Sequence, residues 1–191
     1  MSAPTGDRTF ANKHKLLQWA CQTYEQPESI AIEFGVYQGE TLTTIRNNFT
    51  GNVYGFDSFQ GLPEDWREGY EKESFKPETI PDVQGTELVI GLFNQTLTPF
   101  LNNNTSPISV IHFDADLYSS TIYPLTHITT RLTNPAILIF DEWHNYPGCE
   151  QHEQRAFHEW AAANPNITWR IVATVKPDHD QQVAIETKLL T

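Results

Sequence analysis

Acidic residues follow two apolar runs of this sequence, at the point where each run ends. Asp114 and Asp116 come directly after ISVIHF, and Asp141 and Glu142 come directly after AILIF. Four carboxylates in one crevice cannot all ionise near pH 7 without a compensating charge, and oxygen ligands suit a hard cation, Mg²⁺ first and then Mn²⁺ or Ca²⁺. A divalent ion held by three of them would leave the fourth free to act as a base.

The alternative interpretation of these acids is structural. An Asp after a strand often caps the following helix, and an Asp-Glu pair often stabilises a loop, so for any single acid the structural role is the more common one. Four acids at adjoining strand ends favour a ligand or metal site instead. Asp116 is a candidate catalytic base within that site.

Two histidines lie beside the acids and are further candidates for proton transfer. His112 precedes Asp114 on the same apolar run, and His144 follows the Asp141-Glu142 pair. The pKa of an imidazole is easily moved near neutrality, which suits a general base, although a histidine in such a place is more often only a hydrogen-bond partner. His144 is kept as a second catalytic candidate.

A glycine-spaced turn, in the stretch IAIEFGVYQGET, is a second feature that could bind a ligand. Gly35 and Gly39 allow backbone conformations or close approaches that a Cβ would block, and Thr41 opens a polar helix. Such a turn presents backbone N–H groups to a ligand. The spacing is not the G-x-G-x-x-G of dinucleotide sites, and Glu33 would repel a pyrophosphate. The turn therefore favours a cationic ligand without phosphates, such as S-adenosylmethionine.

Another acid, Asp57, closes the short apolar run VYGFD. An Asp at the end of the second strand of a βαβ unit commonly holds a ribose diol, because one carboxylate accepts hydrogen bonds from both hydroxyls. Capping of the next element is an equal alternative.

Alternating strands and helices must position these residues. The apolar runs predict strands at 30–32, 53–57, 87–90, 108–113, 136–140, 168–174 and 182–188, and helices at 10–24, 41–49, 96–101, 119–132 and 151–163. Pro99 is expected to break the third helix, and Pro124 to lie in the first turn of the fourth. The last two strands, joined through 177–180, are expected to pair antiparallel. The pattern predicts a mostly parallel sheet with ligands at the carboxyl ends of its strands.

The stretch 59–81 has no sustained period and is rich in Gly, Pro and aromatic residues. Long irregular segments in a compact domain are usually functional, and Trp66, Tyr70 and Phe75 favour a lid over the site. The alternative is that these aromatic side chains only anchor the loop to its own domain.

Length and composition limit the remaining possibilities. With 191 residues and 39% hydrophobic content, we expect one domain over 1–191, with a helical segment at 1–29. No run spans a bilayer and the N-terminus lacks the apolar centre of a signal peptide, so a cytoplasmic protein without a membrane partner is expected. The net charge of -12 argues against nucleic acid. Cys21 and Cys149 are expected to be free thiols.

Five blocks of the chain resemble the macrocin O-methyltransferase (TylF-type) family of class I enzymes that use S-adenosylmethionine: EFGVYQGET, YGFDSFQGLPEDW, VIGLFNQTLTPFL, VIHFDADLYSSTIYPL and ILIFDEWHNYPG. The resemblance runs from Ile30 to about Trp160. It implies transfer of a methyl group to a hydroxyl of a small-molecule acceptor, a sugar or another natural product, with a divalent metal, Mg²⁺ first. The elements and the resemblance together predict a Rossmann-like, doubly wound, mostly parallel seven-stranded sheet that ends in an antiparallel hairpin.

The resemblance also implies roles for individual residues. Asp114, Asp141 and Glu142 would hold the metal, and Asp116 would be the base. With the glycine turn, the candidate cofactor-binding residues are Glu33, Gly35, Gly39, Thr41, Asp57, Ser58, Phe59, Gly91, Phe93 and Asp114. The chain departs from the family pattern at Ala115, where Gly is usual, and at Glu142, where a second Asp is usual. A longer carboxylate can still ligate, with a shifted metal preference.

Two other functions fit parts of this pattern. A cofactor-binding or regulatory protein can retain the fold without catalysis. An NAD-dependent oxidoreductase shares the sheet topology and the ribose-binding acid but fits the glycine spacing poorly. The identity of the acceptor and the oligomeric state stay open, a homo-oligomer being one possibility.

Overall fold

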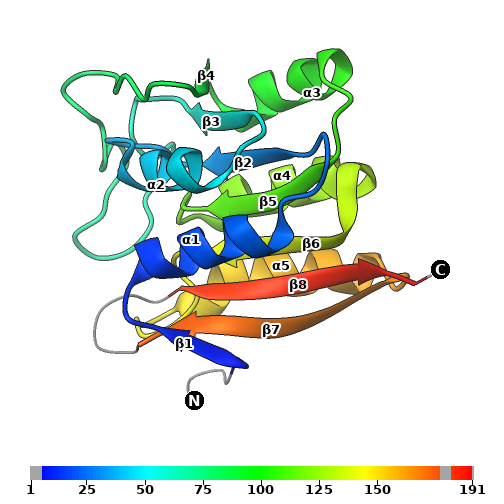
Figure 1. Cartoon of the computed structure of the whole chain (residues 1–191). Coiled ribbons are helices and arrows are strands. Elements are labelled where there is room, and N and C mark those ends of the chain that lie inside the picture. The colour runs from blue at the N-terminus through cyan, green and yellow to red at the C-terminus, as the bar shows by residue number, and fades with distance from the viewer. Residues whose placement is uncertain (1–5, 177–181, 191) are drawn as a thin grey trace.

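The computed structural model describes residues 6–176 and 182–190, and its centre is a β-sheet. The strands are β1 (Arg8–Phe10), β2 (Ile30–Phe34), β3 (Val53–Asp57), β4 (Glu87–Ile90), β5 (Ile108–Phe113), β6 (Leu132–Phe140), β7 (Ile167–Val175) and β8 (Val183–Leu189). They form one eight-stranded sheet in the order β1-β7-β8-β6-β5-β2-β3-β4 (Figure 1). All five residues of β2 and all six of β5 are buried, as expected for central strands covered on both faces.

The pairing within the sheet confirms the predicted arrangement of parallel strands with an antiparallel C-terminal pair. β8 runs antiparallel to both β6 and β7, and the other pairs are parallel. The predicted connection at 177–180 lies outside the described residues. The central strands therefore end at one edge of the sheet, as a ligand site at their carboxyl ends requires.

The predicted count of seven strands is wrong by one. The extra strand, β1, pairs with β7 and places Arg8 opposite Ala173. Three residues are too few to show the alternation of a strand in the sequence. β1 forms because it pairs with the edge of β7, and this contact exists only in the assembled sheet. The predicted helix at 10–24 is correspondingly shorter, because the side chain of Asn12 caps it by accepting a hydrogen bond from the backbone N–H of Lys15.

Helices cover both faces of the sheet, as a doubly wound fold requires. The helices α1 (Lys13–Tyr24) and α2 (Glu40–Asn48) pack on one face (Figure 1). The other face carries α3 (Phe93–Asn103), α4 (Tyr118–Ile128) and α5 (Glu153–Ala163). Each interface buries its own apolar cluster, so the sheet separates two layers of core.

Two predicted effects of proline are wrong. Pro99 lies inside α3, and Pro124 is the seventh residue of α4 and not in its first turn. Each proline removes one backbone hydrogen bond. Both helices continue nevertheless, because their apolar faces are buried against the sheet, for example at Leu97 and Leu125. Tertiary packing outweighs local propensity here.

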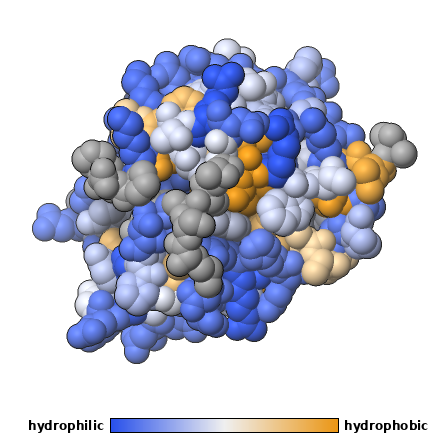
Figure 2. Space-filling view, turned by 90° about the horizontal axis from the view of Figure 1, so that it is seen from below, coloured by the Kyte–Doolittle hydropathy of each residue, from blue (hydrophilic) through white to orange (hydrophobic). Residues whose placement is uncertain are grey.

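Polar side chains cover most of one face of the molecule (Figure 2). The side of the molecule seen from below, where β1 and β7 lie, is mainly hydrophilic, with apolar side chains in small separate areas (Figure 2). None of the helices in the described parts of the chain is long and apolar enough to cross a membrane.

Candidate active site

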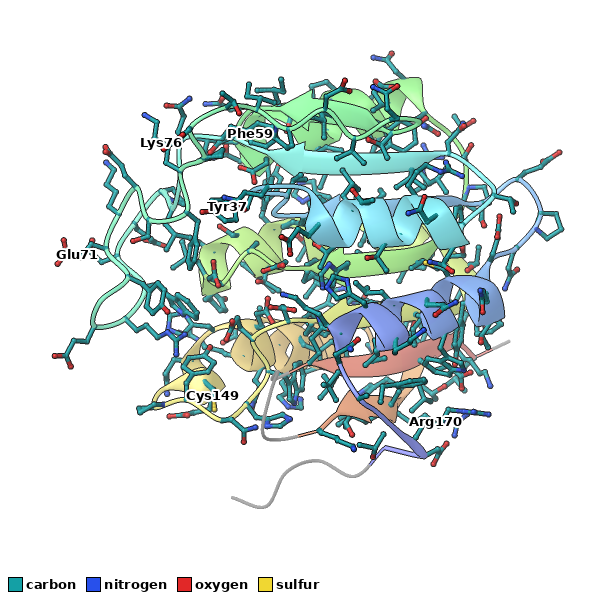
Figure 3. The ribbon with its side chains drawn as sticks, turned by 60° about the vertical axis from the view of Figure 1, so that its left-hand side comes forward. Tyr37, Phe59, Glu71, Lys76, Cys149 and Arg170 are labelled. Carbon is teal, nitrogen blue, oxygen red and sulfur yellow. The ribbon has the colours of Figure 1, made fainter. Side chains whose placement is uncertain are left out.

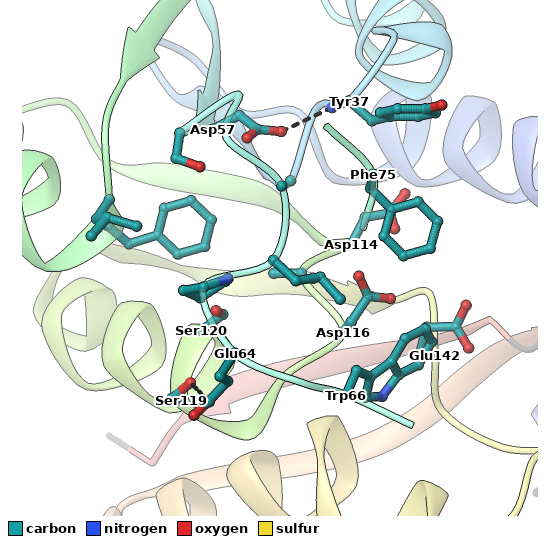
Figure 4. Close-up of a pocket in the computed structure, with 18 of the residues that line it drawn as sticks. Tyr37, Asp57, Glu64, Trp66, Phe75, Asp114, Asp116, Ser119, Ser120 and Glu142 are labelled. Atoms are coloured by element: carbon teal, nitrogen blue, oxygen red, sulfur yellow. Dashed lines mark hydrogen bonds between the residues drawn. The ribbon is translucent and has the colours of Figure 1, made fainter. Parts of the chain in front are cut away.

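A cavity of about 560 Å³ lies at the carboxyl ends of the central strands (Figure 4). Its size falls within the range of small-molecule sites. The switch in strand order between β2 and β5 opens it, since β3 extends the sheet to one side and β6 to the other. Nine residues predicted from the sequence line it: Gly35, Asp57, Ser58, Gly91, Phe93, Asp114, Asp116, Asp141 and Glu142.

Gly35 lets the loop after β2 pass close to the end of β5. Its φ is +92°, and a Cβ at this position would lie 1.8 Å from the carbonyl oxygen of Asp114. The backbone N–H of Asp114 donates to the carbonyl of Phe34 at 2.8 Å, so the two strand ends are tied together. A side chain at Gly35 would separate the two halves of the site.

Gly35→Ala is therefore expected to destabilise the protein more than the matched control Gly148→Ala. Gly148 also has a positive φ, +85°, but nothing lies within 4 Å of its virtual Cβ. Both variants should lose about 1–2 kcal/mol for the left-handed conformation. Gly35→Ala should lose about 1–3 kcal/mol more through overpacking. Urea unfolding of both variants measures the difference, and equal losses would mean that the close approach at Gly35 carries no energetic cost.

Asp57 organises the two loops that follow β2 and β3. Its Oδ2 accepts hydrogen bonds from the backbone N–H groups of Val36 at 2.8 Å and of Tyr37 at 2.9 Å, the second of which is drawn in Figure 4. Its Oδ1 accepts from the N–H of Phe59 at 2.7 Å. A carboxylate has about four lone-pair sites, so little of its capacity is left for a ribose diol. The structure thus gives Asp57 a loop-ordering role that the sequence does not reveal.

The structure does not bring every predicted site residue into the cavity lining. The residues outside it are Glu33, Gly39, Thr41, Phe59 and His144. Gly39 and Thr41 begin α2, and the ring of Phe59 packs in the core layer beneath α1 and α2. His144 is buried beyond β6. The binding and catalytic roles of these five residues stay predictions.

Glu33 lies inside the sheet layer, paired with His112. Both are fully buried, and Nδ1 of His112 is 2.8 Å from Oε1 of Glu33. The two residues are cross-strand neighbours in the β2–β5 register. Nε2 of His112 lies 3.1 Å from the side-chain nitrogen of Gln182 and 3.7 Å from Oδ1 of Asp141. This buried row of polar groups therefore restrains Asp141, which lines the cavity.

The acids at the strand ends form one cluster, as their positions predict. Asp114, Asp116 and Glu142 lie on one side of the cavity (Figure 4), and Nζ of Lys13 is 3.6 Å from Oδ2 of Asp141. Burial and the nearby charge of Asp141 raise the pKa of Asp114 well above its usual value. Burial followed by the charge of Glu142 raises the pKa of Asp116 to about 8. Burial alone would also raise the pKa of Asp141, but His112 and Lys13 outweigh it and lower that pKa.

This electrostatic arrangement fits a divalent cation. Ligand atoms of His112, Asp114 and Asp141 lie within 4.8 Å of one another. Since both ring nitrogens of His112 already face polar partners, the carboxylates are the available ligands, and Glu142 is the next oxygen donor along the lining. A bound cation would offset the burial and the mutual repulsion that keep the pKa values of Asp114 and Asp116 high.

Asp116 has an unusual backbone conformation. Its φ is +59°, in the left-handed region that Asp and Asn tolerate better than most residues. The residue is 7% exposed and lines the cavity. Such conformations persist only where the surrounding structure enforces them, and they cluster at functional sites.

Three residues near the acids were not identified from the sequence. Lys13 is the first residue of α1, and the side-chain amide of Gln182 donates a hydrogen bond to Asp141. Glu153, fully buried, accepts a hydrogen bond from the backbone N–H of Glu142 at 2.9 Å. The sequence carried no signal for Gln182 either, because the prediction paired the last strand only with 168–174. In the structure β8 also pairs with β6, with Phe140 opposite Val183, and this brings residue 182 beside residue 141.

The segment between β3 and β4 is irregular, with one isolated bridge between Arg67 and Tyr70. It projects from the same end of the sheet as the segment that carries Cys149 (Figure 3). Trp66 lines the cavity and lies 5.5 Å from the ring of Tyr146, and the hydroxyl of Ser119 donates to Glu64 at 2.5 Å. The aromatic residues thus both line the cavity and anchor the segment, while closure of the segment as a lid stays a prediction.

Comparison with known proteins gives one family and a consistent fold. Residues 5–173 match the family model described as Macrocin-O-methyltransferase (TylF). The calicheamicin methyltransferase CalS11 is 22% identical, with a TM-score of 0.65 over 90% of this chain and 76% of that chain. The O-methyltransferase NovP is 20% identical, with a TM-score of 0.60 over 90% and 77%. An O-methyltransferase from Bacillus cereus in complex with SAH is 16% identical, with a TM-score of 0.62 over 96% and 84%. No curated protein matches the chain by sequence.

Proposed function

The chain belongs to the macrocin O-methyltransferase family, and on that basis we propose that it transfers a methyl group from S-adenosylmethionine to a hydroxyl of a small molecule. The observation that carries the proposal is the shared cavity, in which the loop at Gly35 and Asp57 faces the acids that end β5 and β6. The acceptor would be a sugar or another natural product, because CalS11 is described as a calicheamicin methyltransferase.

One end of the cavity would hold the cofactor. The loops at Gly35, Ser58 and Gly91 expose backbone there, and Phe93 adds an apolar surface. Asp57 fixes the first of these loops through the N–H groups of Val36 and Tyr37. The structure of the Bacillus cereus relative contains SAH, which supports a cofactor of this chemistry in the present chain.

The acid cluster would hold a divalent metal, Mg²⁺ first, through Asp114, Asp141 and Glu142. Such a cation, when bound, lowers the proton affinity of an oxygen beside it. The chain contributes the geometry, since His112 and Gln182 restrain Asp141 and the carboxylate of Glu153 holds the backbone of Glu142. These neighbours would fix the direction of the ligand oxygens.

Asp116 would take the proton from the acceptor hydroxyl. Its carboxylate lines the cavity, and burial raises its proton affinity. His144, the other candidate base, does not line the cavity. Geometry therefore favours Asp116, because a base must reach the proton that it removes.

Cofactor binding can be tested on its own by calorimetric titration with SAH. The wild-type protein should bind SAH with a Kd of about micromolar order. Asp57→Asn should weaken binding by about 10–100-fold, because an amide cannot accept all three loop N–H groups at once.

Asp65→Asn is the matched control for this titration. Oδ1 of Asp65 also accepts a backbone N–H, from Lys72 at 2.8 Å, but Asp65 does not line the cavity. Its SAH affinity should equal that of the wild type. Absence of SAH binding by the wild type would remove the methyltransferase proposal.

A further inference from the structure

Arg67 occupies an unusual environment in the wall of the cavity. Its guanidinium carbon lies 4.0 Å from the ring centroid of Trp66, 4.7 Å from that of Tyr70 and 4.5 Å from that of Tyr146. A tight turn fixes the residue, because the N–H of Tyr70 donates to the carbonyl of Arg67 at 2.8 Å and the N–H of Trp66 to that of Tyr70 at 3.0 Å. The guanidinium is thus held in place before any ligand arrives.

No carboxylate forms an ion pair with this guanidinium in the part of the chain that the structure describes. The ion pairs there with Lys or Arg involve Lys13, Arg155, Arg170 and Lys188, and Nε of Arg67 is buried without a hydrogen-bond partner. The sequence has 24 Asp and Glu against 12 Lys and Arg, so acidic partners are abundant. A buried donor left without a partner is costly, and a ligand that accepts its hydrogen bond would remove that cost.

We propose that Arg67 binds an anionic group, a carboxylate or a phosphate, on the methyl acceptor. The planar guanidinium matches either group through paired N–H donors, and the aromatic rings around it reduce competition from water. The inference rests on the proposed methyltransferase function and adds a substrate class to it. Arg67 would thereby determine specificity for acidic acceptors over neutral ones.

The position of Arg67 relative to the acids gives the acceptor an orientation. Arg67 and Asp116 both line the cavity. The anion-binding group and the proposed base therefore face the same space for a ligand. An acceptor held by its anionic end at Arg67 would present a hydroxyl toward Asp116.

The test uses simple anions, so that the natural acceptor is not needed. Protein loaded with SAH and Mg²⁺ is titrated with benzoate, phenyl phosphate and the neutral benzamide. The wild type should bind at least one anion about tenfold or more tightly than benzamide. Which anion binds more tightly identifies the carboxylate or the phosphate as the recognised group.

Variants separate Arg67 from the attraction of Mg²⁺ for anions. Arg67→Met should remove the preference for the anion, and Arg67→Lys, which retains the charge and disturbs the aromatic cluster less, should reduce it. Arg155→Met is the matched control, because Arg155 also lies over a ring, 4.4 Å from the centroid of Tyr118, but pairs with Glu159 and does not line the cavity. It should leave all three affinities unchanged.

Two results would overturn the inference. One is a wild type that binds neither anion more tightly than benzamide, and the other is an anion preference that persists in both Arg67 variants. Every titration uses protein that has already bound SAH. Failure of the proposed function would therefore be recognised earlier, because the wild type would not bind SAH.

Discussion

Asp116→Asn is expected to lower turnover by about 10²–10⁴-fold, the usual contribution of a general base, while SAH affinity stays unchanged. The amide has nearly the shape of the carboxylate but cannot take a proton. Asn also tolerates the left-handed conformation that Asp116 adopts, with φ of +59°, so the turn after β5 should survive. The measurement pairs SAH formation, with an acceptor that the wild type methylates, and calorimetric titration with SAH.

His144→Gln provides the comparison for this experiment. His144 is buried but does not line the cavity, so its replacement should change turnover far less than Asp116→Asn. Full turnover by Asp116→Asn would exclude Asp116 as the base. If His144→Gln alone abolished turnover with SAH binding intact, the second catalytic candidate would take that role. A wild type that binds SAH but methylates none of the acceptors tested would favour a protein that retains the fold without catalysis.

The acids were predictable from the sequence because each follows a buried strand. An apolar run followed by a carboxylate marks both the strand and its exposed end, and parallel strands bring such ends to one edge of the sheet. This is why Asp57, Asp114, Asp116 and Asp141 line one cavity in the structure. The positions of the acids along the chain are therefore enough to predict that they lie at one edge of the sheet, even when the order of the strands is unknown.

The buried pairing of Glu33 with His112 depends on strand order and could not be predicted. Its place beside the glycine turn suggested contact with the cofactor, but its side chain faces His112 on the neighbouring strand, buried within the sheet layer. That contact arises only because β2 pairs with β5, and the sequence does not determine which strands are neighbours. Lys13 was missed for the same reason, since α1 meets β6 only in the folded chain.

Strand β1 and the proline-containing helices show a different limit. Local propensity underestimates elements that tertiary contacts stabilise, such as three residues paired at a sheet edge or a helix that continues through Pro99. Phe59 shows a related limit. It lies next in sequence to a residue that lines the cavity, but its ring packs in the apolar core. Burial decided each of these outcomes.

Removal of divalent cations with EDTA is expected to reduce turnover to background, and Mg²⁺ is expected to restore it. The buried acids repel one another, so a cation should also stabilise the folded protein, by about 2.7 kcal/mol at 100 times its Kd. The melting temperature should therefore rise with added Mg²⁺. This second readout does not depend on knowing the acceptor.

Asp114→Asn separates a metal ligand from a structural acid. In EDTA the variant should be as stable as the wild type or more so, since the amide removes a charge that burial and Asp141 disfavour. The stabilisation by Mg²⁺ should disappear together with turnover, whereas the control Asp65→Asn, outside the cavity, should keep both. Full turnover in EDTA would remove the metal from the proposed function. Unchanged stabilisation of Asp114→Asn by Mg²⁺ would place the cation elsewhere, because a ligand that binds only the folded state must lose its effect when its site is lost.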